Sequence, residues 1–97
     1  MYKIVWTDEA IAQLEGIGAY IAIEDPSAAA DLAERLIAVA DSLAAFPHRG
    51  RLGEENSREM TTVWPYILRY RVDGDTVLIL RIRHGARSLD GRESADS

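Results

Sequence analysis

Arginines alternate along two segments in the second half of the chain, at a spacing that could hold an anion. They are Arg69 with Arg71, and Arg81 with Arg83. In a β-strand, side chains two residues apart point to the same side, so each pair would lie on one face of a sheet. The planar guanidinium group binds carboxylate and phosphate through paired hydrogen bonds. The residue type therefore favours binding of phosphate, or of carboxylates from a partner protein.

A structural interpretation of the same arginines competes with this one. An antiparallel sheet often exposes one face to water, and such a face commonly carries charge. However, like charges on adjacent strands repel each other, and the segments 66–72 and 76–84 contain no acidic residue that would neutralise them. This lack of acids favours an external anion as the counter-charge.

His84 and Arg87 lie at the end of the second arginine segment and are the candidates for catalysis. An imidazole titrates near neutral pH and can act as a general acid or base, while Arg81 or Arg87 could hold a phosphate. The alternative interpretation places His84 beside Ile82, at the edge of the hydrophobic core. Three further arginines either are solvated or extend the same basic surface: Arg49, Arg51 and Arg58.

The rest of the sequence offers no other chemistry. It contains no cysteine, which excludes disulfides and thiolate metal sites, and it shows no nucleophile–base pair, metal-binding cluster or phosphate-binding glycine loop. We therefore expect no cofactor and no metal. The chain does not begin with a basic segment followed by an apolar run, and no stretch approaches the ~20 apolar residues that span a membrane. The expected location is the cytoplasm.

Charge divides the chain into an acidic first half and a basic second half. The 97 residues carry a net charge of −5, which argues against a general nucleic-acid-binding protein. Residues 1–46 carry −6, residues 47–87 carry +3 and residues 88–97 carry −2. The length predicts a single domain, 1–97. Its last ten residues, 88–97, are small and charged, and we expect them to form a flexible tail.

Two helices are predicted in the acidic half, after a short strand at residues 2–6. Thr7 offers a hydroxyl that can cap the first helix, and Asp25 followed by Pro26 marks the start of the second. Pro47 is expected to end the second helix near Phe46. So short a connection between helices predicts an antiparallel hairpin. The second helix should bury one stripe of side chains: Ala29, Leu32, Leu36, Val39, Ala40, Leu43 and Phe46.

Three strands are predicted in the basic half, after a polar loop at residues 47–57. They cover residues 58–63, 66–72 and 76–84, and the last two form a hairpin around Asp73 and Gly74. A two-residue loop would mix arginines and apolar residues on both faces. A three-residue loop, with Gly74 in the left-handed conformation, separates them.

The three-residue loop therefore predicts two distinct faces of this hairpin. One should lie under the helices and carry Tyr66, Leu68, Tyr70, Leu78, Leu80 and Ile82. The other, which we call the arginine face, should carry Arg69, Arg71, Arg81 and Arg83, together with Ile67, Val77 and Ile79.

The order of these elements and a set of short motifs closely resemble the ParE/RelE toxin superfamily, which includes plasmid stabilisation proteins. The resemblance covers residues 2–87, and the order and spacing of the motifs make it specific. The motifs are Trp6-Thr7-x-x-Ala10, Tyr20-Ile21-Ala22, Asp25-Pro26-x-Ala28-Ala29, Pro47-x-x-Gly50-Arg51, Arg58-Glu59, Pro65-Tyr66-Ile67-x-x-Tyr70-Arg71-Val72 and Val77-Leu78-Ile79-Leu80-Arg81-Ile82-x-His84-x-x-Arg87.

The resemblance implies an α+β fold in which an N-terminal strand and an antiparallel two-helix hairpin pack on one face of a small twisted antiparallel sheet. It also implies a type II toxin that is neutralised by a cognate antitoxin, with which it forms a hetero-oligomer. An acidic, amphipathic antitoxin segment laid over the arginine face would fit the charge pattern. The candidate residues for binding antitoxin or target are Arg51, Arg58, Arg69, Arg71, Arg81 and Arg83.

The superfamily has two known activities. RelE-like members cleave messenger RNA on the ribosome, whereas ParE-like members poison DNA gyrase. The ribonucleases are usually strongly basic, as ribosome binding requires. They also carry clustered lysines and an arginine just before the apolar-tyrosine run of the penultimate strand. In this chain the only lysine is Lys3, and the position that should be arginine is Ile67.

These departures favour a ParE-like inhibitor of DNA gyrase that has no catalytic activity of its own. The first alternative is a RelE-like messenger RNA endoribonuclease, in which arginines hold the scissile phosphate and His84 moves a proton. The second is a degenerate toxin that has lost its activity. The expected partners are an antitoxin and either gyrase or the ribosome with its message.

Overall fold

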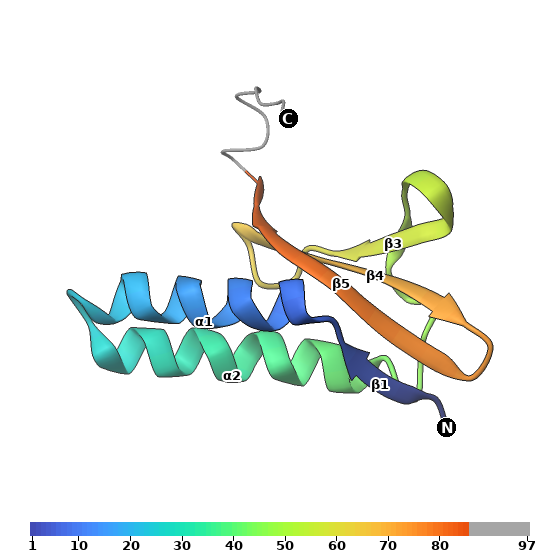
Figure 1. Cartoon of the computed structure of the whole chain (residues 1–97), viewed down its shortest axis with the longest axis horizontal. Helices are drawn as coiled ribbons and strands as arrows, with labels where there is room; N and C mark the ends of the chain where they lie inside the picture. The colour runs from blue at the N-terminus through green and yellow to red at the C-terminus, as the bar shows by residue number, and fades with distance from the viewer. Residues whose placement is uncertain (86–97) are drawn as a thin grey trace.

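The computed structural model describes residues 1–85, which form two helices and one five-stranded sheet (Figure 1). In chain order the elements are β1 (Lys3–Trp6), α1 (Asp8–Ala22), α2 (Pro26–Ser42), β2 (Arg51–Leu52), the short 3-10 helix η1 (Glu54–Asn56), β3 (Ser57–Met60), β4 (Tyr66–Asp73) and β5 (Thr76–His84).

Both helices begin where the sequence predicts. The backbone N–H of Ala10 donates to the Thr7 hydroxyl at 3.1 Å, and the N–H of Ala28 donates to the Asp25 carboxylate at 3.0 Å. Each bond satisfies one of the N–H groups that the first turn of a helix leaves without a partner. The two helices form the predicted antiparallel hairpin (Figure 1). Neither helix, within residues 1–85, is long and apolar enough to cross a membrane.

The second helix ends at Ser42, four residues earlier than predicted. The chain turns at residues 43–45, before Pro47, so Phe46 leaves the buried stripe and is 66% exposed. The prediction that Phe46 is buried is therefore wrong. The rest of the stripe faces inward: Ala29, Leu36, Ala40 and Leu43 are buried, and Leu32 and Val39 are partly buried.

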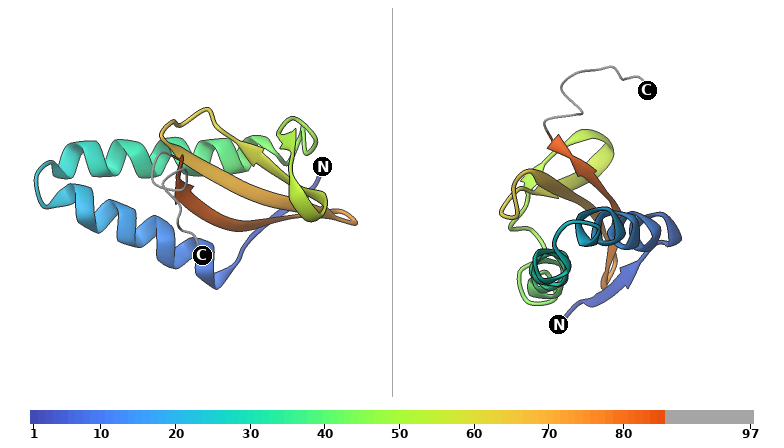
Figure 2. Two further views of the ribbon diagram at one scale, coloured as in Figure 1. Left: turned by 90° about the horizontal axis from the view of Figure 1, so that it is seen from above. Right: turned by 90° about the vertical axis from the view of Figure 1, so that its left-hand side faces the viewer.

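The sheet has the strand order β1-β5-β4-β3-β2, and both helices cover one of its faces (Figure 2). Pairing is antiparallel except at one edge, where β1 joins β5 in parallel, so the sheet is mixed. The predicted α+β fold, with a helical hairpin on one face of a small sheet, is confirmed. The segment 47–57 is not entirely a loop, because it contains β2 and η1.

The hairpin between β4 and β5 turns over two residues, Gly74 and Asp75, so the predicted loop length is wrong. Gly74 does adopt the predicted left-handed conformation, with a φ of 63°. The two faces are separated instead by a β-bulge, since the pairing shifts between Arg69 and Tyr70 and leaves Leu80 as an extra residue on β5. Beyond the bulge, odd-numbered residues of β4 pair with odd-numbered residues of β5, as the longer loop was expected to bring about.

The bulge leaves the four arginines on the predicted side but changes the side of four apolar residues. Val77 and Ile79 were expected on the arginine face, yet both are completely buried in the core. Leu78 and Leu80 were expected in the core but lie on the arginine face. Leu78 stands opposite Arg71 on β4, and Leu80 lines a hollow together with the arginines.

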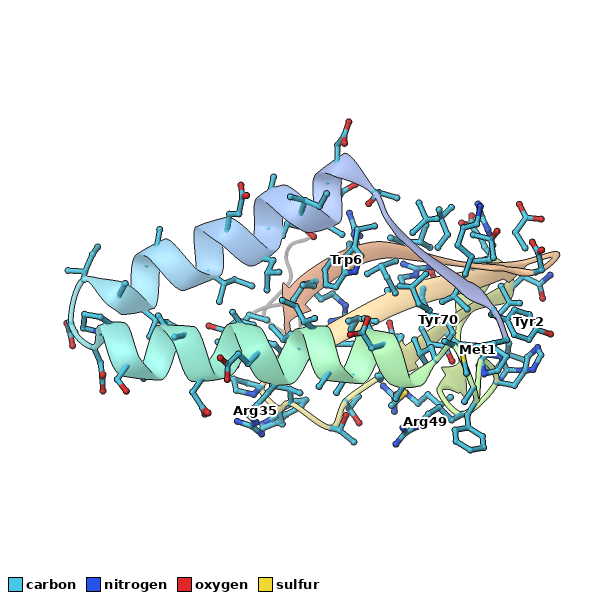
Figure 3. All side chains as sticks on the ribbon, turned by 90° about the horizontal axis from the view of Figure 1, so that it is seen from below. Met1, Tyr2, Trp6, Arg35, Arg49 and Tyr70 are labelled. Carbon is cyan, nitrogen blue, oxygen red and sulfur yellow. The ribbon has the colours of Figure 1, made fainter. Side chains whose placement is uncertain are left out.

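The core between helices and sheet contains two groups of side chains. One surrounds the fully buried Tyr70 and Leu68, and the other surrounds Leu36 and Ile82. Trp6 packs against both groups, and Figure 3 shows it over the sheet, between the two helices. Because β1 carries Trp6, pairing of this edge strand with β5 joins the two halves of the core.

Tyr70 also fixes the path of the chain after α2. Its hydroxyl donates to the carbonyl oxygen of Pro47 at 2.7 Å and accepts from the N–H of Gly50 at 3.0 Å. A Cβ atom on Gly50 would lie 2.7 Å from the Tyr70 hydroxyl oxygen and 3.0 Å from the carbonyl oxygen of Glu59. Glycine is therefore required at position 50 for close approach of the loop to the sheet.

We predict opposite effects for two Gly→Ala substitutions. Gly50→Ala should lower the free energy of unfolding by roughly 1–3 kcal/mol, because the added methyl group collides with buried atoms. Gly18→Ala should raise it by about 0.5–1 kcal/mol, because alanine favours a helix and the added Cβ has no atom within 4 Å. Urea denaturation of both variants would measure the changes. Equal effects of the two substitutions would contradict this account of the loop.

Candidate functional site

The arginine face lies on the side of the sheet opposite the helices. Arg69 and Arg81 stand opposite each other on β4 and β5, and Arg71 and Arg83 flank them on the same strands. Arg51 joins this side, because Arg51 pairs with Glu59 and Glu59 pairs with Arg69. The structure thus brings together five of the six arginines that the sequence proposed for binding.

Two acidic residues neutralise part of this face from neighbouring elements. Glu59 on β3 forms ion pairs with Arg83 at 3.1 Å and Arg51 at 3.4 Å, and its side chain is only 14% exposed. Glu9 in the first turn of α1 pairs with Arg81 at 3.2 Å. The expectation that an external anion must supply the counter-charge is therefore wrong for these three arginines, since the acids come from other elements.

Arg69 is held by neutral acceptors rather than by an acid. Its Nε donates to the Ser57 hydroxyl at 2.9 Å, and its Nη2 lies 3.4 Å from the carbonyl oxygen of Glu54. Ser57 is only 2% exposed, and its own hydroxyl donates to that same carbonyl at 2.5 Å. The guanidinium group of Arg69 therefore has a fixed orientation, and no acidic side chain of residues 1–85 pairs with it.

Arg71 makes no hydrogen bond or ion pair with any residue from 1 to 85, and it is exposed. It lies beside Arg69 and Arg81 at the edge of a hollow of about 270 Å³. The other residues that line this hollow are Thr7, Glu9, Glu55, Ser57 and Leu80. The arrangement can accept an anion from outside the chain, because one guanidinium group is uncommitted and a second is bound only by neutral groups.

Arg58 belongs to the other side of the sheet. It pairs with the buried Tyr70, and its Nη1 donates to the carbonyl oxygens of Gly50 at 2.8 Å and His48 at 3.2 Å. Arg49, labelled in Figure 3, donates to the Ser42 hydroxyl at 2.9 Å. These two arginines hold the loop after α2 in place, so the structure does not add Arg58 to the arginine face.

His84 lies on the other side of the sheet from Arg69, Arg71 and Arg81, although it lines a separate hollow beside α1 together with Arg83. It pairs with Tyr66 at the end of β5, on the same side as Ile82, as one of the two interpretations of the sequence predicted. The rings of His84 and Tyr66 meet edge to face, with centroids 5.3 Å apart and an interplanar angle of 84°. Arg87, the third candidate for catalysis, lies outside the described residues.

The described part of the chain contains no group of three histidine or acidic side chains that could hold a metal ion. The acids and the serine that shape the arginine face were not found from the sequence. Glu59 could have been found, because Arg58-Glu59 alternates on a predicted strand and its glutamate must face opposite to its arginine. Glu9 could not, since it depends on where α1 meets β5.

The fold described above is that of a known class of small toxins. A solved structure described as "Chromosomal ParDE TA system from P. aeruginosa" superposes with a TM-score of 0.75 and 29% sequence identity, covering 87% of this chain and 96% of that one. The family model "ParE toxin of type II toxin-antitoxin system, parDE" matches residues 4–89. The chain belongs to this family, and it is the toxin of a type II toxin–antitoxin system. Such membership implies a cognate antitoxin as partner.

Similar proteins carry both names used in the superfamily. "Toxin RelE2" of Caulobacter vibrioides is 48% identical over 87 residues, which cover 90% of this chain and 99% of that protein. "Putative toxin Y4kP" of Sinorhizobium fredii is 42% identical over 84 residues, with coverage of 84% and 86%. The similarity thus extends over nearly the whole toxin. The names of these relatives do not distinguish gyrase inhibition from RelE-like activity.

The Tyr70 hydroxyl, which holds the loop after α2 at Pro47 and Gly50, should make stability depend on pH. Burial raises the pKa of Tyr70 above its ordinary value near 10.0, against the opposing effects of the Gly50 hydrogen bond and of Arg58 and Arg49. The folded state therefore favours the protonated phenol. Its contribution to stability is fully present below pH 10 and is lost as the pH rises through the raised pKa.

We expect Tyr70→Phe to lower the free energy of unfolding by about 1–2 kcal/mol at pH 7, because two backbone groups lose their partner. The difference between wild type and variant should stay constant up to pH 9.5 and shrink above pH 10. Urea denaturation across this range would measure it. The exposed Tyr20, substituted as Tyr20→Phe, is the matched control. A difference that grows above pH 10 would contradict the role given to the Tyr70 hydroxyl.

Proposed function

We propose that this toxin is ParE-like: it arrests growth by binding DNA gyrase and has no catalytic activity of its own. We also propose that its antitoxin neutralises it by covering the arginine face. The first proposal rests on the separation of His84 from Arg69, Arg71 and Arg81, and the second rests on the charge of the arginine face.

A ribonuclease of the alternative type needs its proton-transfer group and its phosphate-binding groups around one phosphate. In this chain His84 faces the helix side of the sheet and contacts Tyr66, whereas Arg69, Arg71 and Arg81 face the opposite side. Groups on opposite faces of a sheet cannot contact one phosphate together. This separation supports a toxin that acts by binding.

The electrostatics of the face favour a protein partner over nucleic acid. Three acidic side chains lie on or beside it, namely Glu9, Glu55 and Glu59, and the whole chain carries −5. A nucleic acid brings a continuous row of phosphates, which these acids would repel. An antitoxin segment can instead place isolated carboxylates between apolar residues, matching single arginines with Leu78 and Leu80 between them.

The alternative remains a RelE-like endoribonuclease. The 48% identity to "Toxin RelE2" favours it, and it would need residues beyond 85 to complete a catalytic group on the arginine face. In that case Arg81 would bind the phosphate, and His84 would have to approach the same phosphate from the other side of the sheet, around the end of β5. The two functions predict different products in the same assay.

We expect purified toxin to trap gyrase on supercoiled plasmid, so that treatment with detergent and protease releases linear DNA. The same preparation should leave ribosome-bound messenger RNA intact. Both reactions can be followed by gel electrophoresis, with an excess of antitoxin as the control that restores normal gyrase activity. Cleavage of message without trapping of gyrase would overturn the proposal and favour the ribonuclease.

His84→Phe separates the two functions within one protein. Phenylalanine preserves the edge-to-face contact with Tyr66 but cannot carry a proton. Growth arrest by the variant should equal that of wild type if the toxin acts by binding. A loss of arrest of 100-fold or more, in roughly the range that proton-transfer groups contribute, with unchanged thermal unfolding, would support catalysis instead.

A further inference from the structure

The hollow at the edge of the arginine face combines three features that point to a ligand. It has a volume of about 270 Å³, and Arg69, Arg71 and Arg81 line it. A buried hydroxyl fixes one of these arginines, a second has no partner within residues 1–85, and a strained backbone turn forms the rim. An uncommitted guanidinium group beside one whose orientation is fixed is an arrangement that can bind an anion.

Arg69 is prepared for an anion by Ser57. Side chains as buried as Ser57, which is 2% exposed, usually serve packing or satisfy a backbone group. This hydroxyl accepts from Nε of Arg69 at 2.9 Å and donates to the carbonyl oxygen of Glu54. The Nη2 atom has only a long contact of 3.4 Å with that carbonyl. The outer edge of the guanidinium group is therefore available to an incoming oxygen.

The rim of the hollow is a strained turn. Glu55 has φ 54° and ψ 42°, and Asn56 has φ 63°, so two consecutive residues other than glycine adopt the left-handed conformation. Such conformations are unfavourable for residues with a Cβ and concentrate at binding sites. In this chain the turn places the carbonyl of Glu54 against Ser57 and Arg69. The strain is thus coupled to the orientation of Arg69.

The hollow suits one singly charged group rather than a chain of charges. Arg71 supplies an uncommitted guanidinium group, while Arg81 is already paired with Glu9. Glu9 and Glu55 at the edges repel further negative charge. Leu80 adds an apolar wall. A carboxylate on an aliphatic stem matches this combination, because the stem can contact the leucine while both oxygens face the two arginines.

We propose that this hollow receives a single aspartate or glutamate side chain of the antitoxin, clamped by Arg71 and Arg69, with Ser57 as the positioning residue for Arg69. The proposal rests on the proposed binding of the antitoxin to the arginine face and names one contact within it. Because Arg71 is exposed and unpaired within residues 1–85, its substitution removes a ligand contact without removing an internal one.

The test is a double-mutant cycle between toxin and antitoxin, measured by calorimetric titration of purified toxin with purified cognate antitoxin. Arg71→Ala should weaken binding roughly 10- to 100-fold, as expected for a hydrogen bond between charged groups. Each acidic residue of the antitoxin is then changed to alanine in turn. For one of these antitoxin residues alone, the change to alanine should cause no further loss of affinity in the Arg71→Ala toxin. Changing that same antitoxin residue to lysine should restore binding to the Arg71→Glu toxin.

Arg35→Ala is the matched control, because Arg35 is an exposed residue of α2 (Figure 3) and does not line the hollow. It makes the same change of charge and should leave affinity unchanged. Ser57→Ala should weaken binding less than Arg71→Ala, and only when Arg69 is present. Urea denaturation of each variant shows whether the toxin remains folded, and Arg71→Ala carries the test if Ser57→Ala does not fold.

The outcomes separate this contact from the proposed function. If Arg81→Ala and Arg83→Ala weaken antitoxin binding while Arg71→Ala does not, the antitoxin covers the face but the carboxylate site is overturned. If none of these arginines affects antitoxin binding, the assignment of the face to the antitoxin fails as well. If Arg71→Ala abolishes binding of a single-stranded RNA oligonucleotide and not of antitoxin, the hollow is a phosphate site, and the proposal is overturned.

Discussion

The arrangement of this protein depends on one irregularity in the pairing of β4 with β5. Leu80 is an extra residue on β5, between two stretches of regular pairing. A bulge of this kind changes the side to which the following residues point. Because of it, Ile79 and Ile82 both face the helices although they are three residues apart, while Arg81 and Arg83 stay on the opposite side. With regular pairing, the odd positions of β5 would share one face, and these two arginines would be directed toward the core.

The fold and the four arginines of the arginine face could be predicted from the sequence, but the register and the apolar residues of that face could not. Alternation along a strand is local, so Arg69 with Arg71 and Arg81 with Arg83 could be paired without knowing how the strands meet. The position of a bulge is not local, because residues 77–80 are all apolar and suit either face. The prediction therefore assigned Leu78 and Leu80 to the core in place of Val77 and Ile79. Helix starts were predictable, since caps and proline act within one turn.

The bulge also determines which side chains lie together on one face of the sheet. His84 lies three residues after Arg81, a spacing that in a regular strand would put the two on opposite faces, and regular pairing resumes beyond the bulge. His84 therefore stays with Ile82 and Tyr66 on the helix side. Family resemblance alone would not reveal this, because relatives of this chain carry both ParE and RelE names. The separation of His84 from Arg69, Arg71 and Arg81 is a property of strand geometry, and it is the reason why we propose binding rather than catalysis.

The acids around the arginine face adjust its selectivity more than its stability. The ion pair of Glu9 with Arg81 joins two side chains that are about half exposed, and pairs of this kind contribute only about 0–1 kcal/mol. A partner that brings its own carboxylate can replace Glu9 at little cost, whereas a dense row of phosphates meets repulsion from the acids around the face. A face that is half neutralised by its own chain would thus favour an acidic peptide over a nucleic acid, although both would be attracted to the arginines alone.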